Sequence, residues 1–193
     1  MSVMRQSHSP EMISKQTQKC LLQAARDSVN YYMLNHQLIQ PKNLLLNTDP
    51  LIHNKQGVFV TIKLNNKLRG CIGSVTSTST IIDQVITHSV NAAIKDPRFD
   101  PITQIDTGNV AYEISILTKP TEIQSSDQID IPKHGVILAK NGKRAVFLPK
   151  VAAENNWDLQ TTLTRLCKKA GLKSDDWKRH ARVAVFEAIE FKE

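Results

Sequence analysis

A cysteine between two glycines has surroundings that could support chemistry at a thiol. Cys71 lies in the segment LRGCIGS, residues 68–74. In an extended strand Arg69, Cys71 and Gly73 point to one face, because the side chains of a strand alternate. A guanidinium beside a thiol favours the thiolate, and glycines let a ligand or another backbone approach closely. Cys71 is therefore a candidate nucleophile, and the candidate ligand contacts of this segment are Arg69, Gly70, Gly73 and Ser74.

The same segment also has a structural interpretation. Cys71 would then be a small buried residue, and the glycines would serve tight packing. Catalysis by a thiol would in addition need a base. His134 and His88 could supply one if the fold brings either close to Cys71, although histidines chosen from a sequence more often serve the surface or the core.

Three further charged residues are candidates for a site. Asp96 and Arg98 enclose a proline where a helix is expected to end, so they could fix a loop by ion pairing or bind an anion through Arg98. Glu113 interrupts an apolar segment, where a buried carboxylate needs a partner such as Arg69 or Arg98. Glu113 is thus either one half of a structural ion pair or a carboxylate of the site.

These residues have to be positioned by a set of helices and hairpins. Helices are expected after Ser14, from Thr80 to about Asp96, and from Leu159 to about Ala170; strands are expected at 57–64, 68–73, 110–117, 136–140, 143–148 and 183–191. The pair Asn141-Gly142 is the strongest signal for a tight turn, since both positions favour positive φ, and Asn65-Asn66 predicts another tight turn after the strand 57–64. Helices and hairpins alternate without βαβ repeats, which predicts an α+β fold with a mixed, largely antiparallel sheet and packed helices.

Several segments together resemble the AMMECR domain family. They are, in order, GVFVTIKLNNKLRGCIGS, DPRFDP, EISILTKP, HGVILAKNGKRAVFLPKVAAENNW and LCKKAGL, and the resemblance spans roughly residues 15–191. It implies one main lobe and a smaller second lobe. It also implies association with a Memo-like protein and a radical-SAM protein, because bacterial members look like protein A of the AmmeMemoRadiSam system. His134 matches the family's HG pattern, which ranks it above His88.

Composition narrows the class of protein. Apolar residues make up 40% of the chain and charged residues 22%, which is typical of a globular protein. The three cysteines lack C-x-x-C spacing, so neither a disulfide framework nor a metal site is expected, and no cofactor motif is present. No apolar run could span a membrane, which favours the cytoplasm. We expect a flexible leader at residues 1–13 and one domain at 14–193, whose two lobes are not independent domains.

Two functions remain open. The first is an enzyme or enzyme subunit that binds a small anionic metabolite or nucleotide at LRGCIGS, with Cys71 as nucleophile. The second is a non-catalytic protein- or nucleic-acid-binding module that uses residues 140–182, which hold 11 Lys or Arg and 4 Asp or Glu. Lys143 and Arg144 are adjacent in a strand and face opposite sides, so we expect dispersed charge and weak or no binding to nucleic acid.

Overall fold

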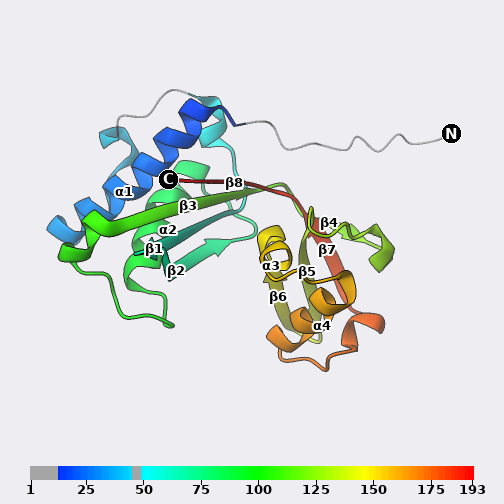
Figure 1. Ribbon diagram of the computed structural model, residues 1–193. Coiled ribbons are helices and arrows are strands. Elements are labelled where there is room, and N and C mark those ends of the chain that lie inside the picture. Colours follow the sequence, from blue (N-terminus) through cyan, green and yellow to red (C-terminus); the bar gives the residue numbers. More distant parts are fainter. Residues whose placement is uncertain (1–12, 45–48) are drawn as a thin grey trace. The chain divides into compact units, whose positions relative to one another are not determined.

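The computed structural model describes residues 13–44 and 49–193, and the chain divides into two compact units (Figure 1). Unit 1 comprises the chain up to Leu117 together with Ile189–Glu193, and unit 2 is Thr118–Ala188. The expected leader lies outside the described residues except for its last position. The predicted α+β class is confirmed, because each unit combines an antiparallel sheet with helices. That the lobes are not independent domains stays a prediction.

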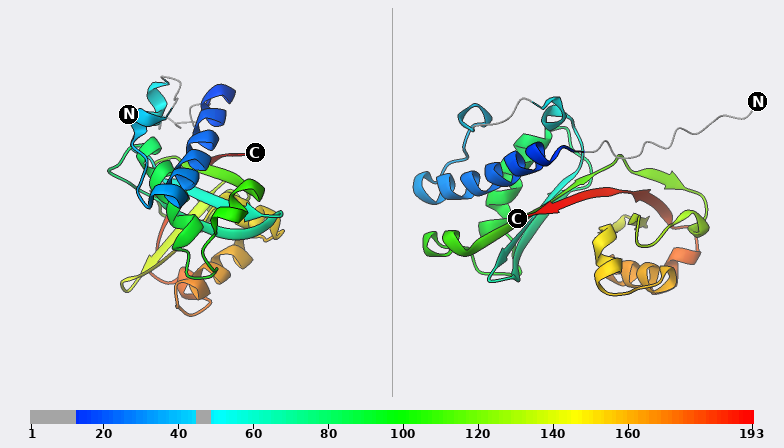
Figure 2. Two further views of the ribbon diagram at one scale, coloured as in Figure 1. Left: turned by 90° about the vertical axis from the view of Figure 1, so that its left-hand side faces the viewer. Right: turned by 45° about the horizontal axis from the view of Figure 1, so that its top comes forward.

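Sheet A, in unit 1, contains four strands in the order β2-β1-β3-β8. Their bounds are β1 Val58–Leu64, β2 Lys67–Ser74, β3 Val110–Leu117 and β8 Ala188–Lys192. β1 is antiparallel to both of its neighbours, and Figures 1 and 2 show β8 alongside β3. The turn from β1 to β2 uses Asn65 and Asn66, which both have positive φ, as the sequence predicted. Because β2 is the first strand in this order, it is an edge strand, and it carries LRGCIGS.

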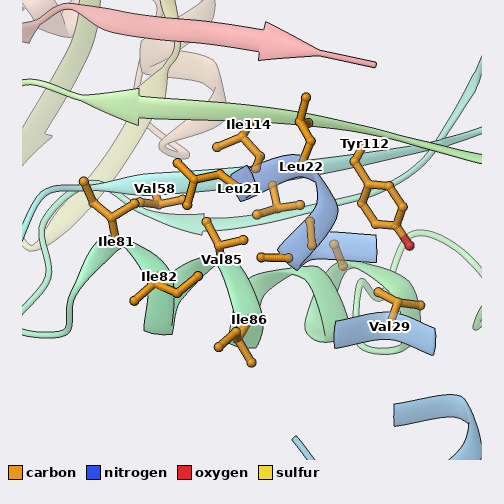
Figure 3. Close-up of a cluster of buried hydrophobic side chains, with 14 of the residues drawn as sticks. Leu21, Leu22, Val29, Val58, Ile81, Ile82, Val85, Ile86, Tyr112 and Ile114 are labelled. Carbon is orange, nitrogen blue, oxygen red and sulfur yellow. The ribbon is translucent and has the colours of Figure 1, made fainter. Parts of the chain in front are cut away.

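Two helices cover one face of sheet A, α1 (Lys15–Asn35) and α2 (Ile81–Ile94). Both start at side-chain caps, because Ser14 accepts the Thr17 N–H and Thr80 accepts the Asp83 N–H. The apolar stripes of the helices meet the apolar face of the sheet, which gives one continuous core (Figure 3). Fully buried members of this core include Leu21, Val58, Val85, Tyr112 and Ile114. α2 is therefore fixed against the strands next to LRGCIGS.

Sheet B, in unit 2, has the order β4-β7-β5-β6. Its strands are β4 Thr121–Ile123, β5 Gly135–Lys140, β6 Lys143–Phe147 and β7 Arg182–Phe186. The predicted β5–β6 hairpin is confirmed, with positive φ at Asn141 and Gly142. Two helices accompany the sheet, α3 (Pro149–Glu154) and α4 (Leu159–Lys169), and α4 packs on it through Leu163 and Leu166.

The remaining helical segments are short 3₁₀ turns, and one strand prediction needs correction. The 3₁₀ turns are η1 Pro41–Asn43, η2 Pro50–His53, η3 Gln104–Asn109, η4 Ser126–Gln128 and η5 Asp176–Lys178. The predicted single strand 183–191 is instead two strands, β7 and β8, which belong to different sheets. Its apolar alternation continues across Glu187, so the pattern alone did not reveal the break. Unit 1 is thus built from two segments that are far apart in the sequence, the one up to Leu117 and the one from Ile189.

Candidate functional site

The side chains of β2 alternate between a helix-facing and an outer face of sheet A. Gly70 lies opposite Ile62, on the face that packs against α2. A Cβ at Gly70 would lie 1.9 Å from the carbonyl oxygen of Ala92 in α2. Gly70 therefore allows the helix backbone to rest directly on the strand, which is a packing role. Gly70 is buried under α2, as the structural interpretation expects, and its role as a ligand contact stays a prediction.

Cys71 lies on the outer face, beside two residues of neighbouring strands. Its thiol accepts a hydrogen bond from the Thr61 hydroxyl, with 3.2 Å between Oγ1 and Sγ. Thr61 pairs with Cys71 of β2 on one side and with Glu113 of β3 on the other, so these three residues form a row across three strands. Thr61 is 5% exposed, whereas Cys71 is only half-buried. Sequence reasoning placed Cys71 and Glu113 in the site but missed Thr61, which only the strand register brings between them.

Glu113 forms an ion pair with Lys63, at the end of the same row. The expected partners were Arg69 and Arg98. Lys63 follows Thr61 by two positions in β1, so both side chains lie on the outer face of the sheet. The alternation of β1 could have indicated Lys63 as a partner, but only with the register between β1 and β3 in hand.

Asp96, just beyond the end of α2, holds the edge of β2. Its buried carboxylate accepts the backbone N–H of Cys71 at 2.9 Å. It also accepts three hydrogen bonds from Arg98, from the backbone N–H at 3.1 Å, Nε at 2.9 Å and Nη2 at 2.6 Å. The hydrogen bond from the Arg98 side chain is the main reason why the pKa of Asp96 lies well below its usual range, against the opposing effect of burial. Of the two interpretations of this pair, ion pairing is the one observed.

Arg98 also brings positive charge to Cys71. Its Nη2 lies 3.5 Å from the Cys71 carbonyl oxygen, and its side chain is 56% exposed. The pKa of Arg98 is raised, chiefly by its hydrogen bond to Asp96. The guanidinium therefore lies beside the backbone of Cys71. The fold thus brings Cys71 next to the Asp96–Arg98 pair, which the sequence analysis had treated separately.

Arg69 has a different environment, because β2 is not regular at this position. Lys63 pairs with Leu68 and Ile62 with Gly70, so Arg69 is the additional residue of a β-bulge. Its charge contributes to lowering the pKa of Asp106 in η3, after the larger effects of the hydrogen bonds from Thr103. The predicted strand is confirmed, but the regular spacing that would align Arg69 with Cys71 is absent.

Ser74 faces α2, on the side of β2 opposite to Cys71. Its hydroxyl donates to Gln84 Oε1 at 2.9 Å, and His88 Nε2 lies 3.4 Å from Ser74 Oγ. The Gln84 amide donates to the Gln56 carbonyl at 2.7 Å, which fixes Oε1 as the acceptor of the Ser74 proton. His88 therefore donates to Ser74 rather than acting as its base, and burial lowers the pKa of His88, which keeps it neutral. This cluster connects α2 to the end of β2.

The last two candidates, His134 and Gly73, each have a structural contact of their own. His134 belongs to unit 2, where its Nδ1 accepts the Asp130 N–H at 3.0 Å and closes a turn before β5. Gly73 lies beneath the Phe59 ring, and a Cβ at this position would come within 2.3 Å of the ring. Both contacts are structural. Their catalytic and ligand-binding roles stay predictions.

Neither a metal cluster nor a membrane span is found in the part of the chain that the structure describes. Groups of three or more His, Cys, Asp or Glu residues that could hold a metal ion do not occur within residues 13–44 and 49–193. Over the same ranges, every helix is too short or too polar for a transmembrane segment.

Fold and site together define a two-unit α+β protein with a cysteine on an edge strand that an Asp–Arg pair holds in place. The chain belongs to the AMMECR1 family, whose sequence pattern matches residues 22–191. A Methanosarcina barkeri protein is 33% identical over 180 residues, covering 91% of this chain and 89% of its own. A Thermoplasma volcanium protein is 39% identical over 153 residues, covering 75% and 76%. The crystal structure of an uncharacterized Pyrococcus horikoshii protein is similar with a TM-score of 0.86, at 30% identity, and covers 94% of this chain and 93% of that one.

Proposed function

We propose that this AMMECR1-family chain is an enzyme or enzyme subunit that binds a small anionic metabolite or nucleotide at residues 68–74, with Cys71 as nucleophile. One observation carries the proposal: a hydroxyl donates to the Cys71 thiol, and a guanidinium lies beside the backbone of the same residue. Thr61 donates to Sγ at 3.2 Å, and Arg98 Nη2 lies 3.5 Å from the Cys71 carbonyl oxygen. Hydrogen-bond donors and cations stabilise a thiolate, which is the reactive form.

The neighbouring charges would have distinct roles in this function. Arg98 is half-exposed, so it can attract the anionic group of a ligand, while Asp96 fixes the direction of its guanidinium. Arg69, in the bulge, would add a second positive charge on the same strand. Glu113 and His134 stay predictions as the proton acceptor, and the association with Memo-like and radical-SAM proteins stays a prediction of the family resemblance.

Alkylation of the three cysteines, resolved by mass spectrometry at neutral pH, tests the proposal. We expect Cys71 to react faster than Cys20 and Cys167, because Cys167 is fully buried and Cys20 lies on a helix without a neighbouring cation in the described contacts. Iodoacetate, an anion, should gain on neutral iodoacetamide at Cys71 relative to Cys20 if Arg98 attracts negative charge.

A matched pair of variants separates reactivity from exposure. Thr61→Val removes the donor at nearly constant volume and should slow the alkylation of Cys71 several-fold, whereas Thr61→Ser should retain it. Labelling of Cys71 no faster than that of Cys20 would contradict the nucleophile and favour a non-catalytic module. An unchanged rate in Thr61→Val would contradict the role given to the hydroxyl.

A further inference from the structure

A row of cations lies along the seam between α4 and β6 in unit 2. Arg165 and Lys169 are one helical turn apart on α4, and each covers an aromatic ring. The Arg165 guanidinium carbon lies 4.6 Å from the centroid of the Trp157 ring, and Lys169 Nζ lies 4.8 Å from that of Phe147. The two rings are themselves in contact, with centroids 5.6 Å apart. Two positively charged groups thus lie side by side, each over one of two aromatic rings that contact each other.

Lys143 extends this row beyond the end of α4. Its Nζ donates to the Gly171 carbonyl oxygen at 2.5 Å, while Lys169 Nζ donates to that of Val146 at 2.9 Å. We call Lys143, Arg165 and Lys169 the α4–β6 row. Arg144 is not part of it, because Ala145 is buried against the core of unit 2 and adjacent strand residues face opposite sides. The expected dispersal of charge therefore holds for Arg144 but not for these three residues.

Lys143 and Arg165, two members of the row, are not paired with carboxylates in the way that nearby basic residues are. Lys140 forms an ion pair with Asp176, and Arg182 forms one with Glu122. Among the residues that the structure describes, neither Lys143 nor Arg165 has an ion pair with a carboxylate. Lysines at the end of α4 also compensate the helix dipole, but Arg165 lies a full turn earlier and is exposed. Compensation of the helix end therefore does not account for Arg165.

We propose that the α4–β6 row is an interaction surface for an acidic segment of another protein. An arginine stacked on an aromatic ring is held in position, so its N–H groups can receive a carboxylate in a bidentate manner with little loss of entropy. Arginine and aromatic residues are also the types that contribute most to protein interfaces. Single-stranded nucleic acid fits less well, because Arg165 and Lys169 cover the ring faces on which bases would stack.

Fluorescence anisotropy with the full chain and a labelled peptide of ten glutamates tests this surface. Arg165→Gln and Lys143→Gln should each weaken binding by about fivefold or more, and added salt should weaken it further. Arg144→Gln removes the same charge from the opposite face of the sheet and should change binding less than twofold. Thermal unfolding of each variant checks that it is folded, and two row positions keep the test decisive if one variant is not.

Three results would overturn the proposal. The peptide could fail to bind the wild-type chain at low salt. Arg144→Gln could weaken binding as much as Arg165→Gln, which would mean that net charge alone is responsible. A ten-nucleotide oligothymidylate could bind more tightly than the peptide and lose affinity in Arg165→Gln, which would assign the row to nucleic acid instead.

Discussion

Replacing Asp96 by asparagine tests whether the carboxylate, and not merely its shape, holds the edge of sheet A. Asp96 is 4% exposed and accepts one hydrogen bond from the Cys71 backbone and three from Arg98. Asparagine keeps one acceptor oxygen, but its NH₂ group would face N–H donors. At least two charge-assisted hydrogen bonds are then lost, and each contributes roughly 1.5–3 kcal/mol.

Solvent reduces this sum, because the Arg98 side chain is 56% exposed. We expect Asp96→Asn to lower the free energy of unfolding by about 2–4 kcal/mol at pH 7. Urea unfolding measures this, and amide hydrogen exchange at Cys71 should accelerate in parallel because its N–H loses an anionic acceptor. Asp100→Asn, at an exposed carboxylate of the same loop, is the matched control and should change stability by less than about 0.5 kcal/mol.

The pH dependence of the free energy of unfolding gives a second, independent test of the role of the Asp96 carboxylate. The pKa of Asp96 is lower in the folded chain than its ordinary value of 3.8. Its ionised form therefore stabilises the fold above that value, and this stabilisation is lost as the pH falls further toward the folded-state pKa. The difference between wild type and Asp96→Asn should accordingly shrink below pH 3.8. A difference under about 0.5 kcal/mol at pH 7, which is the scatter of surface substitutions, would refute the reasoning. A difference that stays constant on acidification would refute it as well.

Three further substitutions test the packing around the site. Tyr112→Phe should raise the free energy of unfolding by about 1 kcal/mol in denaturant titration, because the buried Tyr112 hydroxyl has no partner in the described structure; a loss would contradict this. Gly70→Ala should destabilise the chain by about 3 kcal/mol or more, since its Cβ would strike the Ala92 backbone, whereas Gly108→Ala, with open space, should be nearly neutral in the same assay. His88→Gln should reduce the loss of stability between pH 7 and pH 5, because burial lowers the folded-state pKa of His88 below 6.5, so the unfolded chain takes up the proton first; an unchanged pH profile would count against it.

Local patterns were enough to predict most elements of the fold. The Asn65–Asn66 and Asn141–Gly142 turns, the capped start of α2 at Thr80 and the end of α4 before Gly171 all occur as predicted. Each depends on the conformational preference of one or two residues, which the sequence states directly. The break between β7 and β8 was missed because both strands share one apolar alternation, and only their pairing partners differ.

The sequence by itself determined the α+β class, the family and the strand that carries Cys71, because periodicity and motif order are local properties. Tertiary structure alone decided which groups surround the thiol. Strand register placed Thr61 against it, a bulge removed Arg69 from regular alignment, and the chain after α2 brought Arg98 to the Cys71 backbone. Register, bulges and helix ends depend on how the whole core packs, so contacts between residues 10 to 27 positions apart cannot be read from spacing.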